Sequence, residues 1–492
     1  MEAAVLAVLA PGFTGPTAPA WLLDAARRGL GGVVLFAGNT PDPATTRALT
    51  ETLHTAGPDL LVAVDEEGGD VSRLQAAAGS ALPGLAALGV VDDEALTRRT
   101  GAALGALLRA TGVDLDLAPV LDVASEPRNP VIGVRSLGAD PALVARHGAA
   151  LVHGLHDGGV AACGKHFPGH GATTVDSHLD LPELDADLAT LRARDLPPFQ
   201  AAVTAGVDAL MTAHVRLPAL GARPGTLEPA VTDLARRLGP AGFDGVLITD
   251  ALDMGAVARD PGLAEAAVQA LEAGADLLCL GSTTGLPDDE APFAAVVAAV
   301  SAAVRSGRLD AGRLRGAAAR TARLRQRLRG YRAAAPRPAV EEAEATLAAV
   351  GAEAARRAVR THGPARIDAA PVLVDLRRRL DHAAGRTAPA LAEALRRRWP
   401  GTHVVLAGPL GPGALDAALA GVPAARPVVV LTREPLADPG EQAALATVLA
   451  ARPDAVVVHA GTADGAPRAA ALVLAHGVGR ANAEAVVERL TR

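Results

Sequence analysis

The side chains best suited to chemistry lie in one short segment, residues 165–178, which reads Lys-His-Phe-Pro-Gly-His-Gly-Ala-Thr-Thr-Val-Asp-Ser-His. Lys165 is the only lysine among the 47 basic residues of the chain. A compact ammonium with three rotatable donors can hold several hydroxyl groups in a tight pocket, which a flat guanidinium does less well. We therefore interpret Lys165 as a site residue, against the alternative of a chance lysine on a solvated loop.

At the end of the same segment, Asp176 and His178 are two residues apart. In an extended or turn-like loop their side chains face the same way, so the carboxylate can orient the imidazole. An imidazole held in this manner could protonate a leaving oxygen. Taken alone, the pair also fits a surface aspartate and histidine with no common role.

The other two histidines of the segment, His166 and His170, have the four-residue spacing with which a helix places two imidazoles on one metal ion. Pro168 and Gly169 lie between them and are incompatible with such a helix. The sequence arranges no cysteine or carboxylate as a third ligand. We therefore predict a strand that ends in a glycine-hinged loop, with no metal.

A second candidate for chemistry is Asp250, which directly follows an apolar run and precedes further apolar residues, in Leu-Ile-Thr-Asp-Ala-Leu-Asp-Met at 247–254. An aspartate at the end of a buried strand is held rigidly and can act as a nucleophile. It can equally cap the helix that follows, and the sequence does not separate the two roles.

Asp65 has the same position after an apolar run of its own, and it could accept hydrogen bonds from sugar hydroxyls. Arg73 and Arg135 offer forked donors on neighbouring loops. For either arginine, the ordinary alternative is a solvated side chain.

The segments that must position these residues are largely apolar runs of strand length, most of them followed by a stretch of helical period. Such an alternation predicts an N-terminal (β/α)8 TIM-type barrel with insertions, because parallel strands covered on both faces need no polar alternation. A doubly wound open sheet is the alternative. We favour the barrel, since the charged candidates stand at carboxyl strand ends, which converge on one mouth in a barrel. The eight runs are 5–12, 32–38, 60–65, 113–120, 160–166, 207–214, 245–250 and 275–281.

A basic helical run at 315–329 closes this first unit, and a short stiff spacer, Ala-Ala-Ala-Pro-Arg-Pro, follows it. We therefore predict a catalytic domain at 1–332, a linker at 333–339 and a smaller C-terminal α/β layer domain at 340–492, which serves packing or assembly. A phosphate loop at 408–413 is disfavoured, because its prolines lack the N–H donors that such a loop needs. The domain is predicted to begin with a helix at 340–360, and its strand-length runs are 372–376, 403–407, 427–431, 455–459 and 471–475.

Composition excludes several classes of partner. The formal net charge of -7 gives no basic field for nucleic acid, and no lysine-rich tract exists to hold a membrane surface. Aromatic residues make up only 2% of the chain, too few for stacking platforms along an extended ligand, so short substrates are expected. Cys163 and Cys279 are isolated in apolar runs, and the N-terminus lacks the positive charge of a signal peptide. We therefore expect a cytoplasmic protein, a monomer or homodimer.

Several segments, taken in order and spacing, resemble glycoside hydrolase family 3, and specifically its bacterial β-N-acetylglucosaminidase branch. The resemblance covers about residues 32–281, and its most specific part is the segment 165–178. The matching pieces are Gly-Gly-Val-Val-Leu-Phe at 31–36, Val-Asp-Glu-Glu-Gly-Gly at 64–69, Asn-Pro-Val-Ile-Gly-Val-Arg-Ser at 129–136, Lys-His-Phe-Pro-Gly-His-Gly at 165–171, Asp-Ser-His at 176–178 and Ile-Thr-Asp-Ala-Leu-Asp-Met at 248–254.

The resemblance implies a retaining exo-β-N-acetylglucosaminidase without a cofactor, which releases terminal N-acetylglucosamine from short glycans such as muropeptide fragments in peptidoglycan recycling. It implies that Asp250 attacks the anomeric carbon to form a glycosyl ester. It also implies that His178, paired with Asp176 on a mobile loop, serves first as acid and then as base. The positions that the resemblance assigns to substrate binding are Asp65, Arg73, Arg135, Lys165, His166, His214 and Met254.

The chain differs from the family's usual motifs at two positions beside the binding loops. Asp70 stands where the family usually has an arginine, and Val134 where it has an aspartate. These differences bear on sugar specificity more than on reaction type.

Three alternatives remain open from the sequence. An N-acetylglucosaminide phosphorylase would use the same Asp/His pair, with phosphate in place of water, because a histidine repels that anion less than a carboxylate does. A family 3 β-glucosidase or xylosidase would differ in the sugar. A silent sugar-binding scaffold would lack turnover, although Asp250 and His178 are both intact.

Overall fold

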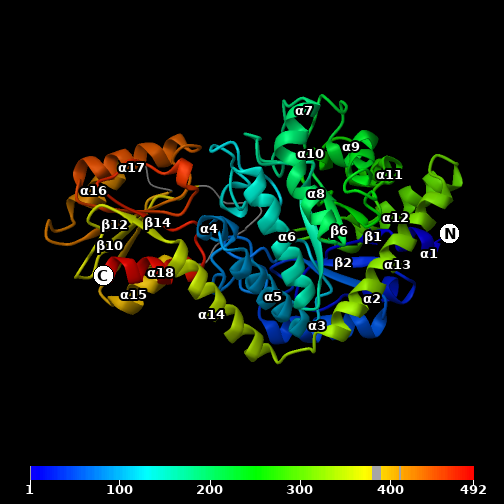
Figure 1. Ribbon diagram of the computed structural model, residues 1–492, viewed down its shortest axis with the longest axis horizontal. Coiled ribbons are helices and arrows are strands. Elements are labelled where there is room, and N and C mark those ends of the chain that lie inside the picture. Colours follow the sequence, from blue (N-terminus) through cyan, green and yellow to red (C-terminus); the bar gives the residue numbers. More distant parts are fainter. Residues whose placement is uncertain (1, 379–388, 409–411) are drawn as a thin grey trace.

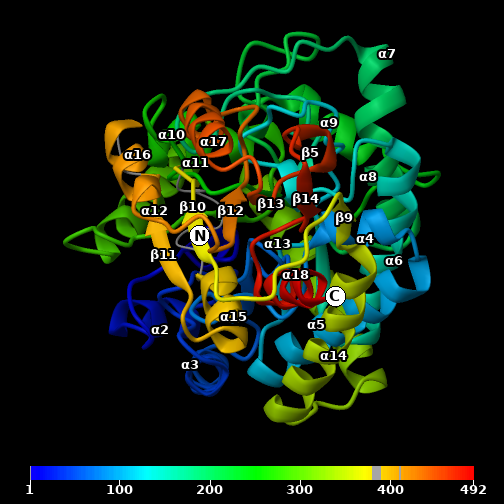
Figure 2. The same ribbon diagram turned by 90° about the vertical axis from the view of Figure 1, so that its left-hand side faces the viewer.

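The computed structural model describes residues 2–378, 389–408 and 412–492. These residues form two α/β regions side by side along the long axis of the molecule (Figure 1). Figure 2, seen from the side of the second region, shows its sheet in front of the first region. Each region has its own apolar core of buried residues.

In the described residues, the first region contains eight parallel strands in chain order. A six-stranded sheet has the order β2-β3-β4-β5-β6-β7, and β1 pairs with β8. The β1–β8 pair is bonded to β2 by Val34 N and Pro11 O (3.1 Å) and to β7 by Thr249 N and Leu277 O (3.1 Å). The prediction of a curled parallel α/β region is confirmed. The strands are β1 (Leu9–Ala10), β2 (Gly32–Leu35), β3 (Leu61–Val64), β4 (Leu115–Asp116), β5 (Ala161–Phe167), β6 (Ala209–Thr212), β7 (Val246–Thr249) and β8 (Leu278–Cys279).

Helices follow the strands, and several begin with an aspartate N-cap. The side chains of Asp42, Asp93 and Asp140 each accept a hydrogen bond from a backbone N–H in the first turn of the helix that they precede. These caps satisfy donors that a helix start otherwise leaves unpaired. The helices of the first region are α1 (Glu2–Leu6), α2 (Ala20–Arg27), α3 (Pro43–Ala56), α4 (Leu85–Val91), α5 (Glu94–Thr111), α6 (Pro141–Asp157), α7 (Leu188–Thr190), α8 (Leu196–Thr204), α9 (Pro229–Arg236), α10 (Gly255–Ala258), α11 (Leu263–Ala273) and α12 (Glu290–Arg305).

A long basic helix, α13 (Ala311–Ala334), covers the amino ends of the strands. Its arginines pair with buried aspartates that directly precede alternate strands: Arg332 with Asp114, and Arg327 Nε with Asp208 Oδ1 at 3.1 Å. Asp276, before β8, is held in the same way by arginines of α13 and α9. Because this end is closed by ion pairs and by Leu324 and Leu328 of α13, the opposite, carboxyl ends are left for a site.

The second region is a six-stranded sheet with the order β11-β10-β12-β13-β14-β9. Its strands are parallel except β9, which runs antiparallel to β14. Helix α14 (Val340–Ala358) leads into it from the first region (Figure 1) and packs against α5 and α18. The remaining elements are β9 (Arg360–His362), β10 (Val372–Asp375), α15 (Ala390–Arg398), β11 (His403–Leu406), α16 (Pro412–Ala420), β12 (Val428–Thr432), α17 (Pro439–Ala451), β13 (Val456–His459), β14 (Ala471–Leu474) and α18 (Arg480–Thr491).

Two element predictions are wrong at their ends. The run 5–12 was predicted as one strand, but its first residues belong to α1 and only Leu9–Ala10 form a strand. A short apolar run does not distinguish a buried helix from a buried strand. The helix predicted at 340–360 ends at Ala358, and the exposed residues of β9 carry no apolar pattern that would reveal a strand.

Other sequence predictions concern single features. Cys163 and Cys279 are buried and unpaired, as predicted. Within the described parts of the chain, we find no helix that is both long and apolar enough to span a bilayer. Residues 409–411 of the loop considered for phosphate lie outside the described residues.

Candidate active site

A solvent-open cleft of about 940 Å³ lies over the carboxyl ends of the strands of the first region. Loops that follow β2, β3, β4, β5, β7 and β8 supply its walls. All the predicted site residues except Asp176 and His214 line it: Asp65, Arg73, Arg135, Lys165, His166, His178, Asp250 and Met254.

The floor of the cleft holds a buried network of charges around Lys165. Lys165 Nζ lies 2.6 Å from Asp65 Oδ1 and 2.7 Å from Glu67 Oε1. Arg135 binds Glu67 with two donors, Nη2 to Oε1 at 2.7 Å and Nε to Oε2 at 2.9 Å. On the open side, Arg73 Nη2 lies 3.8 Å from Asp65 Oδ2. Neighbouring strands β3, β4 and β5 thus bring together residues that are far apart in sequence.

The network keeps its members ionised despite burial. Burial alone would raise the pKa of Glu67, but Arg135 and Lys165 hold it well below its ordinary value. Burial would lower the pKa of Lys165, but Asp65 and Glu67 raise it instead. Asp65 keeps 18% of its side chain exposed while Lys165 keeps 2%. A fixed carboxylate with ammonium and guanidinium groups behind it is suited to bind several hydroxyl groups of one small polar ligand.

Two histidines of the 165–178 segment are fixed by partners of their own. His166 Nδ1 lies 2.7 Å from Oδ2 of Asp122, a fully buried carboxylate that also accepts from the His170 backbone N–H at 2.7 Å. Burial lowers the pKa of His170 to about 4. Its two ring nitrogens lie 2.7 Å from Thr173 Oγ1 and 2.9 Å from Ser177 Oγ. Since both nitrogens of His170 are occupied, the two histidines do not form the metal pair considered from their spacing.

Asp250 begins directly after β7, and its carboxylate faces the cleft with one local partner, the Ala251 backbone N–H at 2.8 Å from Oδ1. Helix α10 begins later, and its N-cap is Met254. The alternative that Asp250 caps this helix is therefore wrong. Burial alone would raise the pKa of Asp250, but His166, His214 and His178 lower it below its ordinary value. The carboxylate is thus ionised, as a nucleophile must be.

His178 reaches the same cleft from the loop after β5. Its Nδ1 lies 2.8 Å from Asp176 Oδ1, which also accepts the His178 backbone N–H at 2.9 Å. Asp176 is 4% exposed and His178 is 26% exposed, so the carboxylate supports the ring from behind. With Nδ1 bound to Asp176, proton transfer in the cleft would use Nε2.

His214, predicted with the binding residues, is fully buried and is absent from the described lining of the cleft. Its ring nitrogens lie 2.9 Å from Thr226 Oγ1 and 2.9 Å from the Ala251 carbonyl oxygen. Burial lowers the pKa of His214. His214 thus holds the backbone carbonyl of Ala251, the residue that follows Asp250. Met254, in contrast, lines the cleft, and its role in substrate binding stays a prediction.

Sequence reasoning missed two site residues, Glu67 and Asp122. Glu67 was visible within the motif at 64–69, but nothing in the sequence indicated that two cations would converge on it. Asp122 comes two residues after the predicted strand 113–120. The rule that singled out Asp65 and Asp250, a carboxylate at a carboxyl strand end, could have found it.

Comparison with known proteins shows the family of the chain. Residues 19–324 match the family model of the glycosyl hydrolase family 3 N-terminal domain. The chain belongs to glycosyl hydrolase family 3. The match spans strands β2 to β8 and all the cleft residues of this family 3 protein named above.

Three similar proteins illustrate the relationship. A β-hexosaminidase of Thiobacillus denitrificans is 40% identical over 268 residues, which are 53% of this family 3 chain and 74% of that protein. A β-hexosaminidase of Bordetella avium is 40% identical over 268 residues, covering 53% of this chain and 76% of that protein. The structure of a family 3 β-N-acetylglucosaminidase from Paenibacillus superposes with a TM-score of 0.86 at 31% identity and covers 100% of this chain and 96% of that one.

Proposed function

We propose that this glycoside hydrolase is a retaining exo-β-N-acetylglucosaminidase that hydrolyses terminal β-linked N-acetylglucosamine from short glycans such as muropeptide fragments, and so acts in peptidoglycan recycling. The observation that carries the proposal is an ionised aspartate, Asp250, in the same cleft as an imidazole backed by a buried carboxylate, His178 with Asp176. The names of the similar proteins support the sugar.

The reaction follows from these groups in two steps. Asp250 attacks the anomeric carbon while His178 donates the Nε2 proton to the glycosidic oxygen, so the C–O bond to the leaving group breaks and a glycosyl ester forms. His178 then takes a proton from water as the water oxygen attacks the same carbon and releases Asp250. Each step inverts the configuration at the anomeric carbon, so the two steps together retain it. The ring is an imidazolium before the first step and a neutral imidazole with its proton on Nδ1 before the second, and in both forms Asp176 accepts the Nδ1–H bond and fixes the ring orientation.

The charged network fits the role of binding the terminal sugar. Asp65 and Arg73 stand at the open side of Lys165, where hydroxyl groups of a bound ring can reach them. His166, oriented by Asp122, lines the wall between this network and Asp250. Fixed donors and acceptors on one side of the reacting carbon favour a single terminal residue in one orientation.

We also propose the finer organisation of the chain. The bonds of the β1–β8 pair to β2 and β7 support one closed (β/α)8 barrel. The end of α13 at Ala334 and the start of α14 at Val340 support a catalytic domain at 1–332, a linker at 333–339 and a C-terminal domain at 340–492. The two unpaired cysteines support a cytoplasmic location.

The deciding experiment replaces the nucleophile. Asp250→Asn is isosteric and should lower kcat on a nitrophenyl β-N-acetylglucosaminide at least about 1000-fold with an unchanged circular dichroism spectrum. Asp244→Asn is the matched control, because Asp244 is exposed near the amino ends of the strands. Turnover retained by Asp250→Asn would remove the assignment.

Product analysis of the wild-type protein on N-acetylglucosaminyl disaccharides tests the reaction class. Free N-acetylglucosamine as the product, at a rate that phosphate does not change, supports hydrolysis. N-acetylglucosamine 1-phosphate as the product would establish a phosphorylase instead. A matched nitrophenyl β-glucoside should react far more slowly, and the opposite preference would contradict the proposed sugar.

A further inference from the structure

We propose that Arg433 of the second region is a positioning residue for the sugar-binding loop of the first region, acting through Asp70. This inference rests on the proposed function and gives the second region a part in it. No residue of the second region is found in the described lining of the catalytic cleft. The second region can therefore act on the cleft only through a residue of the first region.

Asp70 is the point of attachment. Its side chain is only 1% exposed, and Oδ2 lies 2.9 Å from Arg433 Nη2, a buried ion pair between the two regions. Its other oxygen, Oδ1, accepts a hydrogen bond from the Val478 backbone N–H at 2.8 Å. Both partners come from carboxyl strand ends of the second sheet: Arg433 directly follows β12, and Val478 lies between β14 and α18.

The loop that carries Asp70 also carries the binding groups. Asp65 and Glu67, which hold Lys165, precede Asp70 in it. The next residue, Val71, lines the cleft and accepts the Glu67 backbone N–H at 3.1 Å. A shift of Asp70 is therefore passed to Glu67 through a backbone bond.

The second region supports this loop at further points. Gly69 N donates to Leu82 O at 3.2 Å, and the segment around Leu82 is in turn bonded to the start of α18, through Ala481 N to Ser80 O at 3.2 Å and Asn482 Nδ2 to Pro83 O at 3.1 Å. The fit is close, since a Cβ on Gly477 would lie 3.2 Å from Asp70 Oδ1.

Arg433 also stands beside the second binding loop. Together with residues 129–134 it lines a small cleft of about 30 Å³ between the regions. That segment leads directly into Arg135, which binds Glu67. One arginine thus adjoins both loops that meet at Glu67.

The pair also accounts for a sequence difference. Asp70 stands where the family resemblance leads us to expect an arginine. An arginine at this position would face Arg433 with like charge in a buried place, which is strongly unfavourable.

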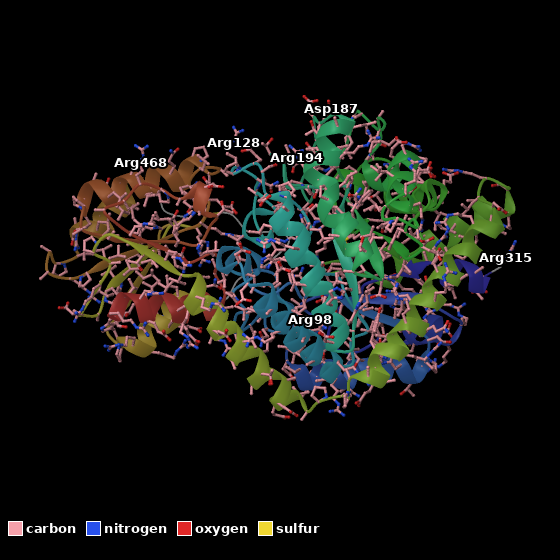
Figure 3. The ribbon with its side chains drawn as sticks, viewed as in Figure 1. Arg98, Arg128, Asp187, Arg194, Arg315 and Arg468 are labelled. Atoms are coloured by element: carbon pink, nitrogen blue, oxygen red, sulfur yellow. The ribbon has the colours of Figure 1, made fainter. Side chains whose placement is uncertain are left out.

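The test compares Arg433→Ala, Asp70→Asn and the double variant in the full-length protein. Asp70→Asn keeps an oxygen for Val478 while it removes the charge. The control is Arg468→Ala, because Arg468 is an exposed arginine of the same region that points away from the molecule (Figure 3). Arg433→Lys serves as the conservative variant.

The first readout is hydrogen–deuterium exchange of amides 66–74. We expect both single variants to speed this exchange about tenfold, with Arg433→Lys between them and wild type and Arg468→Ala unchanged. Exchange at wild-type rates in Arg433→Ala would overturn the inference, whatever the activity of the protein.

The second readout is the division between KM and kcat. The charge network around Lys165 is proposed to bind sugar groups that take no part in bond cleavage. Its displacement should therefore raise KM for the nitrophenyl β-N-acetylglucosaminide about tenfold, with little change in kcat. The double variant should be no worse than the worse single variant, because both remove the same pair. A lower active fraction with unchanged KM would reduce Arg433 to a folding role and overturn the inference. Absence of turnover in wild type would overturn the proposed function alone, and the exchange result would still decide the positioning role.

Discussion

The backbone carbonyl of His178 accepts a hydrogen bond from the backbone N–H of Gly255 at 3.2 Å. A second bond, from Ala256 N to Ser177 O at 3.3 Å, runs beside it. These bonds join the loop after β5 to the segment after β7, so the imidazole of His178 and the carboxylate of Asp250 are held over one cleft by the main chain. The relative position of the proposed proton donor and the proposed nucleophile is thus part of the fold.

This junction has no room for a side chain at Gly255. A Cβ there would lie 2.8 Å from His178 O and 3.0 Å from Leu179 O. We expect Gly255→Ala to push the His178 loop outward and to lower kcat/KM about tenfold for substrates with poor leaving groups, and less for activated ones. Gly330→Ala is the control, because a Cβ at Gly330 meets nothing within 4 Å. An equal loss on all substrates would contradict a displaced proton donor.

His178 itself should show the clearest dependence on the leaving group. In His178→Ala we expect kcat/KM to fall about 100-fold for a phenyl glycoside but only slightly for a dinitrophenyl glycoside, which departs without a proton. Asp176→Asn should show a weaker form of the same dependence on the leaving group. It leaves the His178 ring in place but removes the negative charge beside Nδ1. Rates measured over a series of substituted phenyl glycosides give the slope of log kcat/KM against the pKa of the leaving phenol. A slope unchanged from wild type would exclude the role of acid.

The pH dependence should report the environment of Asp250. Its pKa is lowered, so the carboxylate stays ionised, and the acid limb of kcat/KM should lie below the ordinary aspartate value of about 3.9. His178 is one of the groups that lower this pKa. In His178→Ala, assayed with the dinitrophenyl substrate, the acid limb should therefore move to higher pH. A limb above the ordinary value in wild type would contradict the charge arrangement.

The sequence predicted the strands well because buried parallel strands are nearly continuous apolar runs, and it brought Asp65 and Asp250 to one cleft because each directly follows such a run. It could not predict which way each side chain points. His214 and Asp250 both occupy strand ends, yet His214 is bonded to Thr226 and Ala251 beneath the cleft. The same limit applies to partners distant in sequence, since the pairing of Glu67 with Arg135 depends on the adjacency of β3, β4 and β5.

The Glu67 network should also contribute to stability in a way that depends on pH. Glu67→Gln leaves Lys165 and Arg135 without their shared carboxylate, and breaking a buried pair typically costs about 3 kcal/mol. Because the pKa of Glu67 is lowered in the folded state, its stabilisation is fully present above the unfolded value of about 4.5 and is lost as pH falls below it.

The difference in unfolding free energy between wild type and Glu67→Gln should therefore be large at pH 7 and should shrink toward pH 3. Urea unfolding at pH 7, 5 and 3 measures it. Glu353→Gln is the control: Glu353 pairs with Arg99 at 2.7 Å but is 40% exposed, so its loss should change stability by less than about 1 kcal/mol. If the difference in unfolding free energy between wild type and Glu67→Gln grows on acidification, the Glu67 carboxyl is protonated in the folded protein at neutral pH. The charges assigned to the network around Lys165 would then be wrong.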